Sequence, residues 1–315
     1  PHMPYLMSVV DKSDIQTWAD IGVIFLLFAL GLDFSVKKIL KMGSSPIVAA
    51  STIIACMMTL GMIVGYCFGW KKMDCIFLGG MLAMSSTTII YKAFSDMGLT
   101  QRGFAATVMS VLILEDILAI VMMVMLSTLA RDASPNGMQI LVSVAKIGFF
   151  LVLWFVIGLF AIPLILRSVR KFLNSETLLI VSLGLCCLMA VLSTQVGFSA
   201  AFGAFVMGSI LAETIEADKI IRLVDPVKNL FGAVFFVSVG MLVDPQVLID
   251  YALPILFLVL TILIGQALFG TLGYLLGGQT LKNAMRCGFS MAQIGEFAFI
   301  IASLGLSLRV ISDYL

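Results

Sequence analysis

The sequence predicts an all-α polytopic membrane protein. Of its 315 residues, 61% are hydrophobic and only 12% are charged, whereas a soluble domain carries about 25% charged residues. Apolar runs of about 20 residues, the length that crosses the hydrocarbon core of a bilayer, recur along the chain. A soluble fold cannot bury this much apolar surface, so the lipid bilayer is the expected partner. The net charge of +1 gives no reason to expect nucleic acid.

Apolar runs separated by charged residues predict ten spans. They are 19–36, 46–70, 75–91, 103–130, 147–166, 177–193, 197–212, 229–243, 251–277 and 284–307. The stretch 213–228 is expected to be the longest charged loop. Loops after the odd-numbered spans hold thirteen of the nineteen lysine and arginine residues. Because basic loops face the cytoplasm, that side is expected to be cytoplasmic and both chain ends external.

Motifs for cofactor or nucleotide chemistry are missing from the sequence. The single histidine is His2, the six cysteines have no C-x-x-C spacing, and no glycine-rich phosphate loop occurs. We therefore expect no cofactor, no resident metal centre and no enzymatic activity.

Two carboxylates, Glu115 and Asp116, lie near the middle of the span 103–130. An acidic residue there costs about 2.5–3.5 kcal/mol on insertion scales. All nineteen basic residues lie in loops or at span ends, so the pair must be protonated, hydrated or neutralised by a mobile cation. This predicts ion and proton binding. The alternative is a purely structural pair that orders the helix bundle.

Polar residues interrupt two distant spans. Four hydroxyl residues, Ser85 to Thr88, interrupt the span 75–91, and Ser290, Gln293, Gly295 and Glu296 interrupt the span 284–307. Such breaks are typical of crossed, unwound helices that line a transport site. The alternative for the hydroxyl run is hydrogen bonding back to its own helix. Glu296 is either a second protonatable group or an acceptor for unwound backbone.

Six motifs, in this order, resemble those of Kef-type monovalent cation:proton antiporters. They are "LFALGLDFS", "SSTTIIYKAFSDMG", "LILEDILAI", "GFSAAFGAFVMGSILAET", "FFVSVGMLVDP" and "GFSMAQIGEFAFII". The resemblance covers nearly the whole chain. It implies the sodium/proton antiporter fold, with inverted repeats and two crossed, broken helices.

The same resemblance implies one transmembrane domain over 1–315. Its core or transport part would comprise 46–130 and 251–307, and its panel or dimerisation part 19–36 and 147–243. Compared with the family, the chain is expected to lack two helices at the start, one helix at the end and a cytoplasmic nucleotide-binding regulatory domain. A homodimer of the full-length protein in the cell (inner) membrane is also implied.

The resemblance also assigns site residues. The family's essential aspartate matches Asp116, preceded here by Glu115, and the crossed helix contributes Ser86, Thr87 and Thr88. Gln266 stands where many relatives carry a lysine, so an amide replaces an ammonium. We therefore hypothesise that Glu115 takes over part of the proton carriage. Gln293 and Glu296 are expected to line the second crossed helix.

The sequence thus predicts a secondary active transporter that exchanges K⁺ or Na⁺ for protons through Asp116. Two alternatives keep the same architecture: a gated monovalent cation channel, and an organic-anion symporter, whose pocket would need basic or bulky polar residues. A third alternative is a membrane sensor that transports nothing, in which replacing Asp116 would leave function intact.

Overall fold

The computed structural model describes residues 12–33, 43–131, 174–196, 198–242 and 245–312, with scattered residues between 149 and 164. Helices, and no strand, occur among these residues, which confirms the all-α fold class. Within these described ranges, four helical segments are long and apolar enough to cross a membrane: Ser44–Cys67, Gly103–Ser127, Ser175–Val196 and Ala252–Leu276. The chain divides into two compact units, Pro1–Val36 with Asp132–Asp244 and Lys37–Arg131 with Pro245–Leu315.

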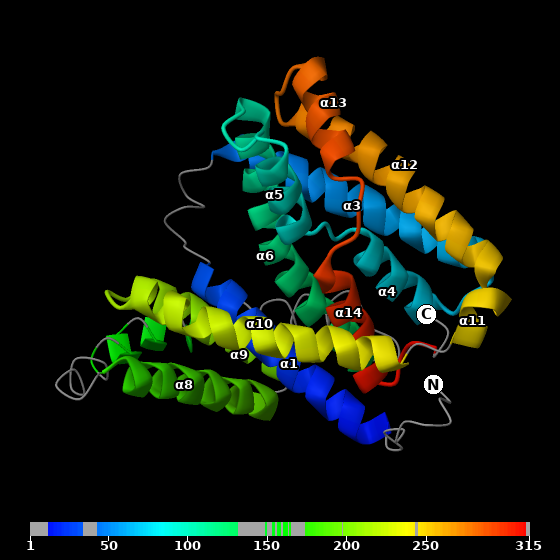
Figure 1. The fold of residues 1–315 in the computed structure, drawn as a ribbon. Helices are drawn as coiled ribbons and strands as arrows, with labels where there is room; N and C mark the ends of the chain where they lie inside the picture. Colours follow the sequence, from blue (N-terminus) through cyan, green and yellow to red (C-terminus); the bar gives the residue numbers. More distant parts are fainter. Residues whose placement is uncertain are drawn as a thin grey trace. The chain divides into compact units, whose positions relative to one another are not determined.

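The first unit contains four helices whose full ranges are described (Figure 1). They are α1 (Lys12–Asp33), α8 (Ser175–Val196), α9 (Ala200–Ala212) and α10 (Ala217–Leu242). Helix α1 packs against α9 and α10, and α8 packs against α9. Ser199 caps α9, because its hydroxyl accepts a hydrogen bond from the Phe202 amide at 3.2 Å. Most of the predicted span 147–166 lies outside the described residues.

Helix α10 corrects the sequence prediction, since the segment expected to be a charged loop, 213–228, is largely helical. Buried Ile220 and Val224 lie one turn apart, and Lys228 pairs with Asp225 at 3.4 Å. Charged residues on the other faces had concealed this amphipathic pattern. Pro226 lies inside the helix, although proline usually disrupts a helix interior.

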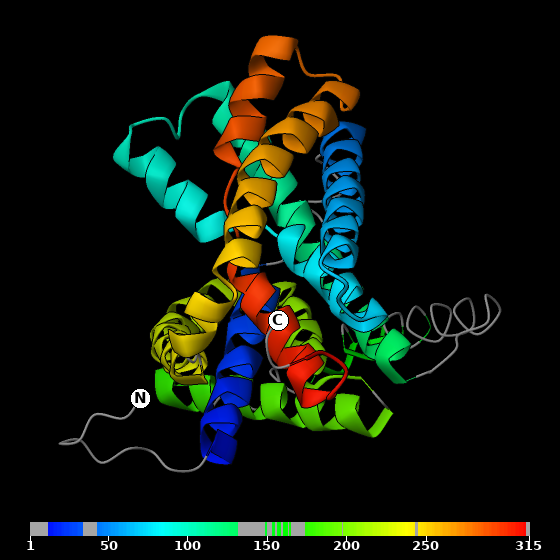
Figure 2. The same cartoon turned by 90° about the vertical axis from the view of Figure 1, so that its right-hand side faces the viewer.

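The second unit contains the predicted core segments. Its helices are α3 (Ser44–Cys67), α4 (Lys72–Leu82), α5 (Thr87–Asp96), α6 (Gly103–Arg131), α11 (Pro245–Asp250), α12 (Ala252–Leu276), α13 (Leu281–Ser290) and α14 (Glu296–Ser307). Helix α3 packs against α4, α6 and α12, while α14 packs against α4 and α6. Figure 2 shows α12 and α13 side by side, in agreement with their extensive contacts.

The two interrupted spans are broken helices, as predicted. Residues 83–86 separate α4 from α5, and residues 291–295 separate α13 from α14. The breaks meet where the Gly295 amide donates a hydrogen bond to the Met84 carbonyl at 2.9 Å. A Cβ atom at position 295 would lie only 2.5 Å from the Ser85 carbonyl oxygen. Only glycine therefore allows the two broken segments to approach this closely.

The second unit is also held together at the far end of α4. Asp74, which is fully buried, accepts hydrogen bonds from the Ser312 amide at 2.7 Å and the Ser312 hydroxyl at 2.8 Å. Ser312 lies just beyond α14, so this contact joins one half-helix of each broken pair. The predicted span 75–91 left Asp74 in a loop, whereas it lies in the first turn of α4. An acidic side chain there is favoured by the helix dipole.

The crossing predicts a specific effect of replacing Gly295. We expect Gly295→Ala to lower the melting temperature of the purified protein, because an added methyl group in a tightly packed site costs about 1–3 kcal/mol. Gly184→Ala in α8 is the matched control, since its added Cβ would meet nothing within 4 Å and alanine favours a helix by about 1 kcal/mol. Circular dichroism melting curves test both variants. Equal melting temperatures for the two variants would contradict this account of the crossing.

Candidate functional site

The two mid-helix carboxylates of α6 occupy different surroundings. The side chain of Glu115 is only 1% exposed, whereas Asp116 is half-buried. Successive residues of a helix point about 100° apart, as 3.6 residues make one turn. The two carboxylates therefore face different neighbours on the broken helices.

Asp116 faces the beginning of α5. The Thr87 hydroxyl donates a hydrogen bond to Asp116 Oδ2 at 3.0 Å, and Thr87 is the first residue of α5. The start of a helix carries partial positive charge from unpaired amides, which favours an anion there. Glu296, the first residue of α14, lies close enough for its carboxylate to repel that of Asp116.

The hydroxyl run serves several purposes. Buried Ser86 caps α5, because its hydroxyl accepts a hydrogen bond from the Ile89 amide at 3.3 Å. Thr87 contacts Asp116, as described above. Thr88 lies in α5, and its side chain is outside the described set. The run therefore caps and begins α5, and it places the Thr87 hydroxyl beside the carboxylate of Asp116.

Two amide side chains tie other elements to the first break. Gln266 of α12 donates from its Nε2 to the Leu82 carbonyl at 3.3 Å. Gln293 of the second break donates from its Nε2 to the Ser86 carbonyl at 3.3 Å. The Leu82 carbonyl lies at the end of α4, where the helical bonding pattern stops. The Ser86 carbonyl already accepts the first hydrogen bond of α5, from the Ile90 amide at 3.3 Å, so Gln293 adds a second bond to it. In membranes a freed carbonyl such as that of Leu82 must find a protein or water partner.

Glu115 faces Ser85, within the break. Its carboxylate lies beside the Ser85 hydroxyl and backbone amide, although neither carboxylate oxygen makes a hydrogen bond of standard geometry. No lysine or arginine of the described residues forms an ion pair with Glu115 or Asp116. Equally, the described chain holds no group of three or more His, Cys, Asp or Glu suited to a metal ion.

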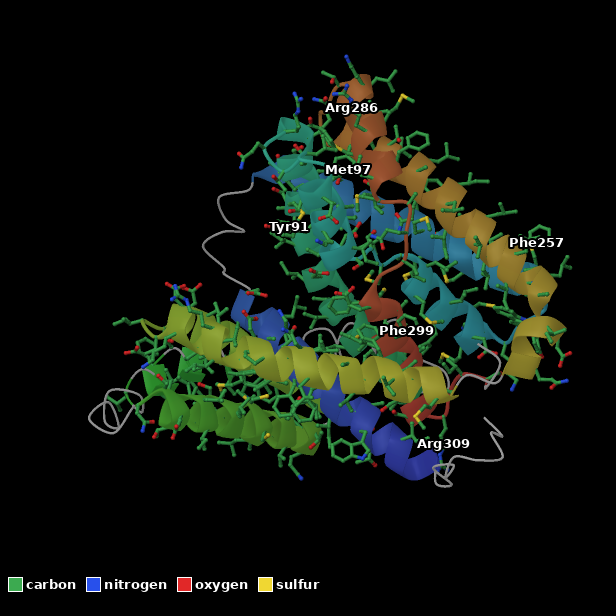
Figure 3. All side chains as sticks on the ribbon, in the orientation of Figure 1. Tyr91, Met97, Phe257, Arg286, Phe299 and Arg309 are labelled. Carbon is green, nitrogen blue, oxygen red and sulfur yellow. The ribbon has the colours of Figure 1, made fainter. Side chains whose placement is uncertain are left out.

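The outward faces of these helices contrast with the polar interior. Figure 3 labels Tyr91 on α5 and Phe257 on α12, whose side chains are 57% and 50% exposed. Large exposed apolar residues are expected where helices face lipid, whereas the polar groups described above gather at the crossing. The arrangement can bind a proton or a monovalent cation on oxygen ligands between helices.

Sequence reasoning missed three contacts of the second unit, two of them at the site. Ser85 belongs to the recognised hydroxyl run, but its contact with Glu115 depends on how α6 packs. The Tyr274 hydroxyl donates to Met291 Sδ at 3.0 Å, a bond between α12 and the second break that no local pattern signals. Asp74 could have been found only as an acidic residue at a helix start.

Comparisons with known proteins agree with the fold and the motifs. Residues 3–315 match the family model described as sodium/hydrogen exchanger, transmembrane. The chain is 30% identical over 314 residues to the K(+)/H(+) antiporter subunit KhtU of Bacillus subtilis, covering 98% of this chain and 77% of KhtU. It is 31% identical to the putative cation/proton antiporter YbaL of Escherichia coli, covering 96% of this chain and 56% of YbaL.

Longer relatives and a solved structure complete the comparison. The chain is 30% identical to K(+) efflux antiporter 6 of Arabidopsis thaliana, covering 98% of this chain but only 53% of that protein. Thus it spans about half the length of the E. coli and Arabidopsis relatives. The sodium proton antiporter MjNhaP1 of Methanocaldococcus jannaschii has the same fold, with a TM-score of 0.66 over 98% of this chain and 78% of MjNhaP1, at 17% identity.

The family match spans nearly the whole chain, and the apolar helices and the crossed breaks agree with it. The chain is therefore a multi-pass membrane protein and belongs to the sodium/hydrogen exchanger family, among the Kef-type cation:proton antiporters.

Proposed function

We propose that this protein exchanges K⁺ or Na⁺ for protons across the cell membrane, with Asp116 as the carboxylate that binds either ion. The observation that carries the proposal is the hydrogen bond from Thr87 to Asp116, 3.0 Å long, at the break between α4 and α5. It brings a mid-helix carboxylate against a hydroxyl group at the start of α5, next to the break. Relatives named as K(+)/H(+) and cation/proton antiporters support the choice of ions.

Coupling follows from the charge of Asp116. The described residues offer it no ion-paired lysine or arginine, and an uncompensated acidic charge in the membrane costs about 2.5–3.5 kcal/mol. The carboxylate therefore crosses between the two faces only with a proton or a cation bound. Because both ligands compete for one group, cation movement in one direction drives proton movement in the other without ATP.

The neighbouring polar residues have supporting roles in this proposal. Thr87 orients the carboxylate of Asp116, while Ser86 and Thr88 form the start of α5. Gln293 and Glu296 line the same crossing from the second broken helix. Gln266 holds the end of α4 as a neutral donor, so Glu115 provides the additional ion- or proton-binding carboxylate.

The two compact units support a division of labour. We assign transport to the unit with the broken helices, and panel or dimerisation functions to the unit with α1, α8, α9 and α10. A homodimer in the cell (inner) membrane is part of the proposal. The longer relatives have room outside the matched region for further parts, such as a cytoplasmic nucleotide-binding regulatory domain.

Replacing Asp116 tests the proposal directly. We expect Asp116→Asn to abolish proton flux driven by K⁺ or Na⁺ in proteoliposomes that report internal pH with a dye, because the amide keeps the shape but not the charge. The matched control is Asp96→Asn, which makes the same chemical change at an exposed residue of α5 paired with Lys92.

The control variant should retain the flux of the unmodified chain. Retained flux in Asp116→Asn would move the exchange to another carboxylate and overturn the proposal. Cation movement without any proton movement in the unmodified chain would instead favour a channel.

Replacing Thr87 tests the hydrogen bond. We expect Thr87→Val to weaken the apparent affinity for the driving cation about tenfold, since a hydrogen bond to a charged group contributes about 1.5–3 kcal/mol. Thr87→Ser keeps the hydroxyl and should remain close to the unmodified chain. Thr107→Val is the control, because Thr107 bonds only the Gly103 carbonyl on the exposed side of α6. Cation titrations of flux provide the measurement, and equal affinities for the two Thr87 variants would exclude a role for the hydroxyl.

A further inference from the structure

Five buried side-chain atoms in the described residues lack a hydrogen-bond partner, and all five belong to side chains at one place. They are Ser85 Oγ, both carboxylate oxygens of Glu115, Gln266 Oε1 and Gln293 Oε1. Each residue contacts or belongs to the stretch 82–86. Since most buried polar atoms in proteins are paired, such a concentration requires an explanation.

The orientation of the two amides is fixed by their nitrogen atoms. Gln266 and Gln293 donate from Nε2 to the carbonyl oxygens of Leu82 and Ser86. Turning either amide over would place its oxygen against a carbonyl oxygen, which is repulsive. Both Oε1 atoms are therefore held as acceptors, and donation at the nitrogen end strengthens an amide oxygen as an acceptor.

The supply of donors is too small for these acceptors. Four of the five atoms only accept while Glu115 is ionised, whereas Ser85 offers two donors beside the carboxylate, its hydroxyl and its backbone amide. The Tyr274 hydroxyl, which lies near Glu115, already donates to Met291 Sδ. A proton on Glu115 removes one acceptor and adds one donor, which makes the numbers equal. The shortage of donors therefore belongs to the ionised state of Glu115, the state that a cation would bind.

A monovalent cation suits oxygens of this kind while Glu115 is ionised. Carbonyl-type oxygens replace the hydration shell of such ions in selective membrane sites, and the charge of the ion neutralises the buried Glu115. The cluster is buried, since Glu115, Ser85 and Gln266 are each at most 2% exposed. An ionised carboxylate in such a place needs a charge partner.

We propose that Glu115, Ser85, Gln266 and Gln293 form a second binding position for a monovalent cation, Na⁺ or K⁺, separate from the position formed by Asp116 and Thr87. The inference rests on the proposed function only for the class of ion. The ligands are a carboxylate, a hydroxyl and two amide oxygens, all supported by the break between α4 and α5. Two adjacent residues of α6 thus serve two different cation positions.

This second position is tested by measuring cation binding at equilibrium, without transport. The full chain is purified in detergent at alkaline pH, and binding of radioactive Na⁺ and of Rb⁺, a stand-in for K⁺, is measured by a scintillation proximity assay. Asp116→Asn is expected to retain cation binding through Glu115. Adding Glu115→Gln to that variant should abolish the remaining binding, and adding Gln266→Leu should weaken it at least tenfold.

The matched control adds Asp96→Asn to Asp116→Asn, and this combination should bind like Asp116→Asn alone. Melting temperatures of all variants separate loss of binding from loss of folding, and Glu115→Asp serves as a second, milder variant that keeps the charge and should keep measurable binding. The inference is overturned if a folded Asp116→Asn binds neither ion, or if Glu115→Gln leaves its binding unchanged. These outcomes are independent of whether Asp116→Asn still transports, which is the criterion for the proposed function.

Discussion

Two membrane helices that stop halfway must satisfy the backbone groups that they release, and this constraint shapes the second unit. Neither a lipid tail nor a neighbouring apolar helix offers a hydrogen bond to a freed carbonyl. The chain solves the problem with neutral donors: the Gly295 amide bonds the Met84 carbonyl, and the side-chain amide of Gln266 bonds the Leu82 carbonyl. Gln293 adds a second hydrogen bond to the Ser86 carbonyl, which the Ile90 amide of α5 already bonds. The α4–α5 break is therefore held from α12 and from the second break together.

The neutrality of these donors has an electrostatic consequence. A lysine at position 266 would place a fixed positive charge beside the end of α4, where the helix dipole is negative. Glutamine donates a hydrogen bond to the same carbonyl without that charge. The negative ends and carboxylates at the crossing thus remain available to mobile ions. The amide of Gln266 therefore has two effects: it bonds the freed Leu82 carbonyl, and it leaves the crossing without a fixed positive charge.

The sequence was sufficient for the features that depend on local patterns. Hydrophobic runs predicted the long helices α3, α6, α8 and α12, and polar interruptions predicted both breaks. It failed where charge concealed periodicity, as in α10, whose buried Ile220 and Val224 lie among charged neighbours. It also failed where partners are distant in the chain. The bonds of Asp74 to Ser312 and of Gln266 to Leu82 join segments that only the tertiary fold brings together.

At the candidate site, too, the sequence predicts local features but not the contacts made by the tertiary fold. A helical repeat of 3.6 residues indicates that Glu115 and Asp116 point in different directions, but not what each one meets. The structure gives Asp116 a hydroxyl donor and a half-buried setting, and gives Glu115 near-complete burial beside unpaired oxygens. Because burial penalises a lone charge more strongly as exposure falls, the two carboxylates differ in how strongly each one needs a positive ligand. Adjacent acids of one helix are thereby made chemically unequal by the broken helices against which they pack.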